Sequence, residues 1–147
     1  MSDLKAKLTL AAVVLFIGVS AASAQIVDGT VLKFKAPTEF KVKDKTFAPG
    51  DYTIQRIPSG IAGSSELVLR NRKGDAMVFD TLLDRDSAPA KNTQLIFDNI
   101  GGENVLAKIV VKGESGSNEI PRTSAQRQAI AKGMPVKRVV MVQDTGF

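Results

Sequence analysis

The sequence predicts an all-β protein, a small antiparallel β-sandwich or barrel of about seven to eight strands with one short C-terminal helix. Three observations support this prediction. Apolar and polar residues alternate over many short stretches, which is the pattern of half-buried strands. Turn signals rich in Gly, Pro, Asn and Asp separate these stretches. One stretch only, near the C-terminus, carries the capping residues of a helix.

The first two expected strands cover residues 30–36 and 40–43. In both strands apolar residues alternate with lysines, so one side is expected to face the core and the other the solvent. Pro49-Gly50 follows, and we predict a tight turn there, because Pro sets φ for the second turn position and Gly tolerates a positive φ at the third. Strand signals on both sides of this turn predict a succession of hairpins with mainly antiparallel pairing.

The middle of the chain predicts five further strands. They cover residues 51–57, 65–71, 76–83, 94–100 and 105–112. The last two are expected to pair as a hairpin across Gly101-Gly102. Between the strands we expect a polar loop at 84–92, which holds Pro89, and a flexible Gly-Ser loop at 113–118.

Near the C-terminus the pattern changes from a period of two to that of a helix. Thr123 and Gln126 have the spacing of a capping box, which predicts a helix at about 124–132 that ends at Gly133. A final strand is expected at about 136–142. Its apolar residues form a run rather than an alternation, which is typical of a strand that is covered on both faces.

Residues 1–24 have the features of a cleaved signal peptide. Lys5 and Lys7 precede an apolar run at 8–22, which ends in the small residues Ala22-Ser23-Ala24. We therefore expect a mature single domain of residues 25–147, located in the periplasm or outside the cell. A retained membrane anchor is the alternative, but the run is short for a spanning helix, so we expect no stable membrane span after cleavage.

The chain contains no His, no Cys and no Trp, and it has one Tyr. Without these residues neither a Ser-His-Asp triad nor a zinc site built from His or Cys can form, and no disulfide is possible. The shortage of aromatic residues also argues against a stacking platform for single-stranded nucleic acid or sugar. We therefore assign no catalytic residue, no metal and no cofactor, and expect no nucleic-acid partner.

The formal net charge is +5, and it falls to about +4 once the signal peptide, with its two lysines and one aspartate, is removed. A candidate site for an anionic partner, such as an envelope component or an acidic protein, lies on the first two strands if they pair. It comprises Lys33, Lys35, Lys41 and Lys43, with Lys45 next to them. The alternative is a solvated face that keeps the sheet soluble and discourages edge pairing, and we favour it.

Two groups of acidic and amide residues could offer oxygen ligands. The first is Asp80, Asp84 and Asp86; the second is Asp98, Asn99, Glu103 and Asn104. Their spacing matches no calcium loop, so we interpret the first group as solvated carboxylates and the second as ordinary hairpin residues.

Several motifs resemble a largely uncharacterised group of small exported bacterial β-rich proteins with the pattern F-x-x-P…F-x-V…L-P-A-G-x-Y-x-V. The matching residues are Phe34 to Pro37, Phe40 to Val42 and Ala48 to Ile54, followed by Leu69-Arg70-Asn71, Leu95-Ile96-Phe97 and Glu119-Ile120-Pro121. The resemblance implies a small exported β domain and transfers no catalytic residue. The aromatics that this group carries after the Gly-Gly hairpin are absent from residues 105–111. The Pro-Gly-Asp-Tyr-Thr turn also resembles that of transthyretin-like and collagen-adhesin B-type β-sandwich modules.

Taken together, the sequence predicts a non-catalytic exported binding or structural module of the bacterial cell envelope or extracellular space. The alternative is a homo-oligomeric assembly or matrix subunit, which would self-associate through its C-terminal strand or another edge strand. A carboxylate-based hydrolase is the less favoured third reading, because it needs a cleft with two facing carboxylates.

Overall fold

The computed structural model describes residues 31–57 and 62–143. The expected signal peptide, its cleavage site and residues 25–30 lie outside these ranges. Within them the chain forms ten strands and one α-helix, which is more strands than expected. The elements are β1 (Val31–Ala36), β2 (Phe40–Val42), β3 (Lys45–Phe47), β4 (Gly50–Ile57), β5 (Ser64–Asn71), β6 (Ala76–Pro89), β7 (Thr93–Ile100), β8 (Glu103–Val110), β9 (Ser115–Glu119), α2 (Ser124–Ala131) and β10 (Val136–Gln143).

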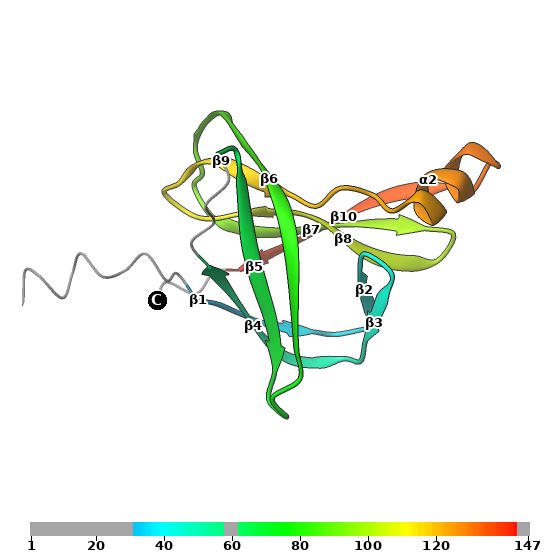
Figure 1. Cartoon of the computed structure of the whole chain (residues 1–147), viewed down its shortest axis with the longest axis horizontal. Helices are drawn as coiled ribbons and strands as arrows, with labels where there is room; N and C mark the ends of the chain where they lie inside the picture. The colour runs from blue at the N-terminus through cyan, green and yellow to red at the C-terminus, as the bar shows by residue number, and fades with distance from the viewer. Residues whose placement is uncertain (1–30, 58–61, 144–147) are drawn as a thin grey trace, which may run out of the picture. The chain divides into compact units, whose positions relative to one another are not determined.

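The strands form one continuous, folded sheet in the order β1-β4-β5-β6-β9-β8-β2-β3, with β7 on the other side of β8 and β10 beyond β7 (Figure 1). Among the described residues β1 pairs only with β4 and β10 only with β7, so the sheet is not closed. The all-β, sandwich-like class with one C-terminal helix is therefore confirmed. Pairing is antiparallel as expected, except for a short parallel contact between β2 and β8.

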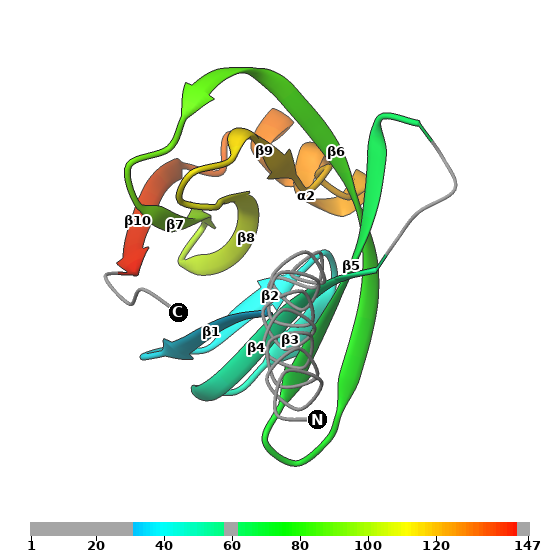
Figure 2. The ribbon, with the colours of Figure 1, turned by 90° about the vertical axis from the view of Figure 1, so that its left-hand side faces the viewer.

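The strand β6 carries the sheet from one layer to the other (Figure 2). Its first half pairs with β5, and its second half, from Leu82 to Pro89, pairs with β9 across a shift in register. A strand that changes partners in this way bends at an irregularity of the ladder. The prediction of a polar loop at 84–92 was therefore wrong, because long-range pairing keeps these polar residues extended.

The expected flexible loop at 113–118 is also largely strand. Residues Ser115–Glu119 form β9, which pairs with both β6 and β8. Gly116, Ser117 and Asn118 are buried there. Gly and Ser have low strand propensity, but two neighbouring strands supply backbone partners on both sides and override this local preference.

Pro49-Gly50 forms a bend between distant parts of the sheet and not the turn of a hairpin. It separates β3, which pairs with β2, from β4, which pairs with β1 and β5. Gly50 has a φ of 150°, which favours glycine. The Tyr52 hydroxyl donates a hydrogen bond to the Ala48 carbonyl and so closes the bend from inside. The prediction of a hairpin at Pro49-Gly50 was therefore wrong.

The core is built around an aromatic cluster of Phe34, Phe40, Phe47, Tyr52 and Phe97. Phe40 lies at its centre, with ring centroids 5.1 Å from Tyr52 and 5.9 Å from both Phe34 and Phe97. Edge-to-face and stacked pairs at such distances are favourable. Four of these aromatics, all except Phe47, belong to the sequence motifs noted above, so motif residues form much of the core of the fold.

The helix confirms the predicted capping box. The Thr123 hydroxyl accepts a hydrogen bond from the Gln126 backbone N–H at 3.3 Å, and the Gln126 side chain accepts one from the Thr123 N–H at 2.9 Å. The Gln126 amide also donates to the Lys43 carbonyl at 2.7 Å. None of the helix residues is buried. The Gln126–Lys43 bond, together with one from the Thr123 hydroxyl to the Asp44 carboxylate at 3.0 Å, joins the start of α2 to the turn between β2 and β3.

Candidate functional site: the β10 edge

The four candidate lysines do not form the face that was expected from pairing of the first two strands. β1 pairs with β4, and β2 pairs with β3 and β8, so that pairing was wrong. Lys33 and Lys35 are exposed on β1. Lys41 is 2.9 Å from the Glu103 carboxylate, and Lys43 lies in a turn at a φ of 55°. The structure therefore leaves two of the four lysines exposed and side by side on one strand.

The first group of acidic residues lies on β6. The Asp84 carboxylate accepts a hydrogen bond from the Asp86 backbone N–H at 3.1 Å, which is a local backbone contact. Within residues 31–57 and 62–143, no three His, Cys, Asp or Glu side chains are grouped so that they could hold a metal ion.

Asp98 was interpreted from the sequence as an ordinary hairpin residue, but the structure places it in a buried ion-pair cluster. Its side chain is 5% exposed and binds two arginines. Arg122, just before α2, donates to one carboxylate oxygen at 2.9 Å, and Arg138 of β10 donates to the other at 3.3 Å. The only sequence signal was its position between Ile96 and Ile100, which share its face of β7. Asp98 thus ties both the segment before α2 and β10 to β7.

The most unusual surface of the described protein is β10. Every residue from Val136 to Val140 is exposed, and Val139 and Val140 are 41% and 48% exposed. Met134, just before the strand, is also 48% exposed. The prediction that the final strand is covered on both faces was therefore wrong. Its apolar run reflects a surface strand and not a central one.

The pairing of β10 with β7 shows where its side chains lie. Val139 is opposite Phe97, on the face directed to the core, and Met141 next to it packs against the core cluster. Val140 is opposite Ile96, on the face that also carries Asp98. Exposed apolar residues thus occur on both faces of β10.

The free edge of β10 has a clear chemical capacity. In an antiparallel pair half of the backbone N–H and C=O groups of an edge strand point away from its partner. Among the described residues only β7 pairs with β10, so the other edge is open to a further strand. Natural proteins protect such edges with charges, prolines or bulges, and strand addition is a common mode of recognition where they do not. Lys137 and Arg138 are the only charges among the described side chains of β10.

Comparisons with known proteins identified no relative of this chain. No protein-family model, curated protein or solved structure matches this chain. No helix in the described part of the chain is long and apolar enough to span a membrane.

Proposed function

We propose that this chain is an exported, non-catalytic structural module that assembles with a second copy of itself by pairing the free edges of their β10 strands. One observation supports the proposal above all: β10 combines an open backbone edge with exposed valines on both faces. An unpaired edge strand with exposed apolar residues is a site where a further strand can add. Export is inferred from the sequence of residues 1–24, and with no His or Cys in the chain an assembly role fits better than a catalytic one.

The charges of β10 favour antiparallel self-pairing. A two-fold axis at Val139 places Val139 opposite its own copy, Lys137 opposite Met141, and Arg138 opposite Val140. Opposite residues in a sheet contact each other directly, so this register separates like charges. A parallel, in-register pair would place each cation against its own copy, which is unfavourable. The antiparallel pair also has the closed two-fold symmetry that is commonest among homo-oligomers.

Pairing would extend the sheet across both molecules as β7-β10-β10-β7. The Asp98–Arg138 contact supports this arrangement, because it holds β10 in the register that presents its outer edge. Val139 is the residue closest to the proposed axis, and its neighbour across the interface would be the same residue of the second copy. Its apolar side chain would lose solvent-exposed surface on pairing, which favours association.

The test is the solution mass of residues 25–147 by light scattering, at concentrations up to about 1 mM so that weak pairing is populated. We expect a dimer that becomes a monomer in the Val139→Lys variant, because the new lysines would face each other at the axis. Val78→Lys is the matched control: Val78 is an exposed strand valine of β6, and this variant should remain dimeric.

A second measurement tests the register. The chain has no cysteine, so Val139→Cys introduces a single thiol. Directly opposite residues have Cβ atoms about 4.5–5.5 Å apart, close enough for oxidation to link them with small adjustments. We expect a covalent dimer for Val139→Cys and none for Val78→Cys. A folded wild-type monomer throughout the concentration range would overturn the assembly proposal; a dimer without the disulfide would overturn the Val139-centred register.

A further inference from the structure

A small pocket lies between the segment 120–122, just before α2, and the strands β7 and β8. Its volume is about 190 Å³, below the roughly 300–1,000 Å³ of sites for drug-sized ligands. Its charged lining residues are Lys43, Asp98, Lys108, Glu119, Arg122 and Arg138. Four of these are cationic and two are carboxylates, so the lining residues carry a formal charge of +2. The pocket therefore has room for a small ligand and attracts an anion.

Two arginines share one carboxylate in this lining. Arg122 donates to one oxygen of Asp98 at 2.9 Å, and Arg138 donates to the other oxygen at 3.3 Å. Among the described residues neither guanidinium group has a second partner, so each keeps N–H donors for a ligand. One negative charge lies against two positive ones, which leaves positive charge uncompensated at this point.

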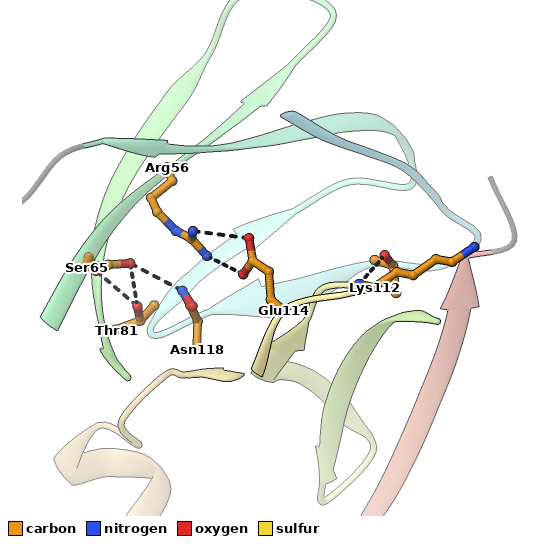
Figure 3. Close-up of polar contacts among 7 residues, drawn as sticks. Arg56, Ser65, Thr81, Lys112, Glu114 and Asn118 are labelled. Atoms are coloured by element: carbon orange, nitrogen blue, oxygen red, sulfur yellow. Dashed lines mark hydrogen bonds and ion pairs between the residues drawn. The ribbon is translucent and has the colours of Figure 1, made fainter. Parts of the chain in front are cut away.

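The pair of Arg56 and Glu114, elsewhere in the fold, shows a balanced arrangement for comparison (Figure 3). The two terminal nitrogens of Arg56 donate to the two oxygens of Glu114, at 3.3 and 2.9 Å. One cation thus occupies both oxygens of one carboxylate, and the two charges cancel. Lys108, in the lining of the pocket, is likewise paired with Glu119 at 3.2 Å. The cluster around Asp98 differs from these pairs by its excess of arginine.

The two arginines are accessible to a ligand, although the carboxylate between them is not. The side chain of Asp98 is 5% exposed, whereas those of Arg122 and Arg138 are 41% and 58% exposed. An anion can therefore reach the guanidinium groups from the solvent. Asp98 holds both groups beside each other before any ligand arrives, so less conformational entropy is lost when an anion binds.

The chemistry of the lining indicates the class of anion. A guanidinium group is planar and always charged, and its fork of donors matches the oxygens of a phosphate or a carboxylate. A phosphate group on a side chain or small molecule carries a charge of about −1.5 to −2 at neutral pH and offers three acceptor oxygens, whereas a carboxylate has one charge. The phosphate therefore matches the formal charge of +2 better. Leu82, which is 55% exposed and also lines the pocket, offers an apolar contact for the organic part of an ester.

We infer that this pocket binds a phosphate group through Arg122 and Arg138, either as inorganic phosphate or as a phosphate ester. The site goes beyond the assembly proposed for β10 and does not require it, because all of its residues belong to one chain. Of the four lysines that the sequence suggested for an anionic partner, Lys43 lines this pocket. A small anion in a partly solvated pocket should bind weakly, with a dissociation constant on the order of millimolar.

The test is an NMR titration of isotope-labelled residues 25–147 with inorganic phosphate, phenyl phosphate and sodium acetate. Constant ionic strength removes the effect of salt screening on the signals. We expect both phosphate compounds to shift the side-chain Nε–H signals of Arg122 and Arg138 in a saturable way, and acetate to bind more weakly than either. Tighter binding of phenyl phosphate than of inorganic phosphate would support an ester whose organic part lies against Leu82, and the reverse order would support the free ion.

A pair of variants separates binding in the pocket from general attraction to a positive protein. Arg122→Gln should weaken phosphate binding by about 3- to 10-fold, because it removes charge-assisted hydrogen bonds that are partly exposed to water. Arg56→Gln is the matched control: it removes the same charge from another arginine–carboxylate pair, outside this pocket, and should bind phosphate as the wild type does. The spectrum of each variant shows whether it is folded, so affinities are compared between folded proteins.

Three results would overturn the inference. The first is the absence of saturable shifts with both phosphate compounds. The second is binding of acetate as tight as that of phosphate. The third is an equal affinity for phosphate in Arg122→Gln and Arg56→Gln, whether both are weakened or neither is.

Discussion

Asp98→Asn offers the sharpest test of how the fold holds β10. The Asp98 side chain is 5% exposed and accepts charge-assisted hydrogen bonds from Arg122 at 2.9 Å and Arg138 at 3.3 Å. Asparagine has nearly the same shape, so the substitution removes the charge without opening a cavity. It also turns one acceptor oxygen into an NH₂ group, which faces an arginine donor. Both links from Asp98, one to the segment before α2 and one to β10, are weakened together.

The magnitude follows from the two contacts. A hydrogen bond to a charged group contributes about 1.5–3 kcal/mol, so two contacts set an upper limit of about 3–6 kcal/mol. The arginine side chains are 41% and 58% exposed and regain water when the carboxylate is lost, which lowers this figure. The remaining asparagine oxygen also keeps one weaker bond. We therefore expect a loss of about 2–3 kcal/mol in the free energy of unfolding, a large part of the roughly 5–15 kcal/mol typical of a domain.

Urea unfolding followed by circular dichroism measures this loss. With a slope of about 2 kcal/mol per molar urea, the midpoint should fall by about 1–1.5 M. Arg122→Gln and Arg138→Gln, alone and combined with Asp98→Asn, complete two double-mutant cycles, and each should show a non-additive term. A midpoint within about 0.2 M of the wild type would refute the reasoning, because it would mean that desolvation of Asp98 cancels both contacts.

Two further predictions concern Gly116 and Tyr52. Gly116→Ala should lower the free energy of unfolding in urea by more than about 2 kcal/mol, because the new Cβ would meet the Asp84 carbonyl. The control is Gly113→Ala, where φ is a similar 81° but no atom lies within 4 Å of the added Cβ, so the loss should be only about 1 kcal/mol. Equal losses in the two variants would contradict the steric argument. Burial, with a smaller contribution from the Asp75 carboxylate, raises the pKa of Tyr52 above its usual value of 10.0, so the phenolate absorbance of this single tyrosine should titrate above that pH in the folded protein. At a pH between the pKa of Tyr52 in the unfolded chain and its raised pKa in the folded protein, the folded state binds more protons. The contribution of Tyr52 to the free energy of unfolding is therefore complete below pH 10 and declines above it. A stability difference between the wild type and Tyr52→Phe that does not shrink above pH 10 would contradict this assignment.

The sequence by itself determined most of the local structure. Alternation of apolar and polar residues located β1, β2, β4 and β5, because a strand with one buried face repeats every two residues. The capping box located α2, because its two hydrogen bonds join residues three apart. Phe34, Phe40 and Tyr52 stood out as inward-facing motif residues, and they form the aromatic core.

Tertiary structure alone decided which strands pair and which faces are covered. Residues 113–118 have the composition of a loop, and only the partners β6 and β8 make part of them a strand. The valine run of β10 is compatible with a central strand or with an exposed edge, and the choice depends on whether a second neighbour lies beside it. From the sequence alone Asp98 is interpreted as a hairpin residue, and only the fold brings Arg122 and Arg138, which are distant in sequence, into contact with it. Each of these features depends on contacts between distant segments, and the short-range periods and caps of a single sequence do not encode them.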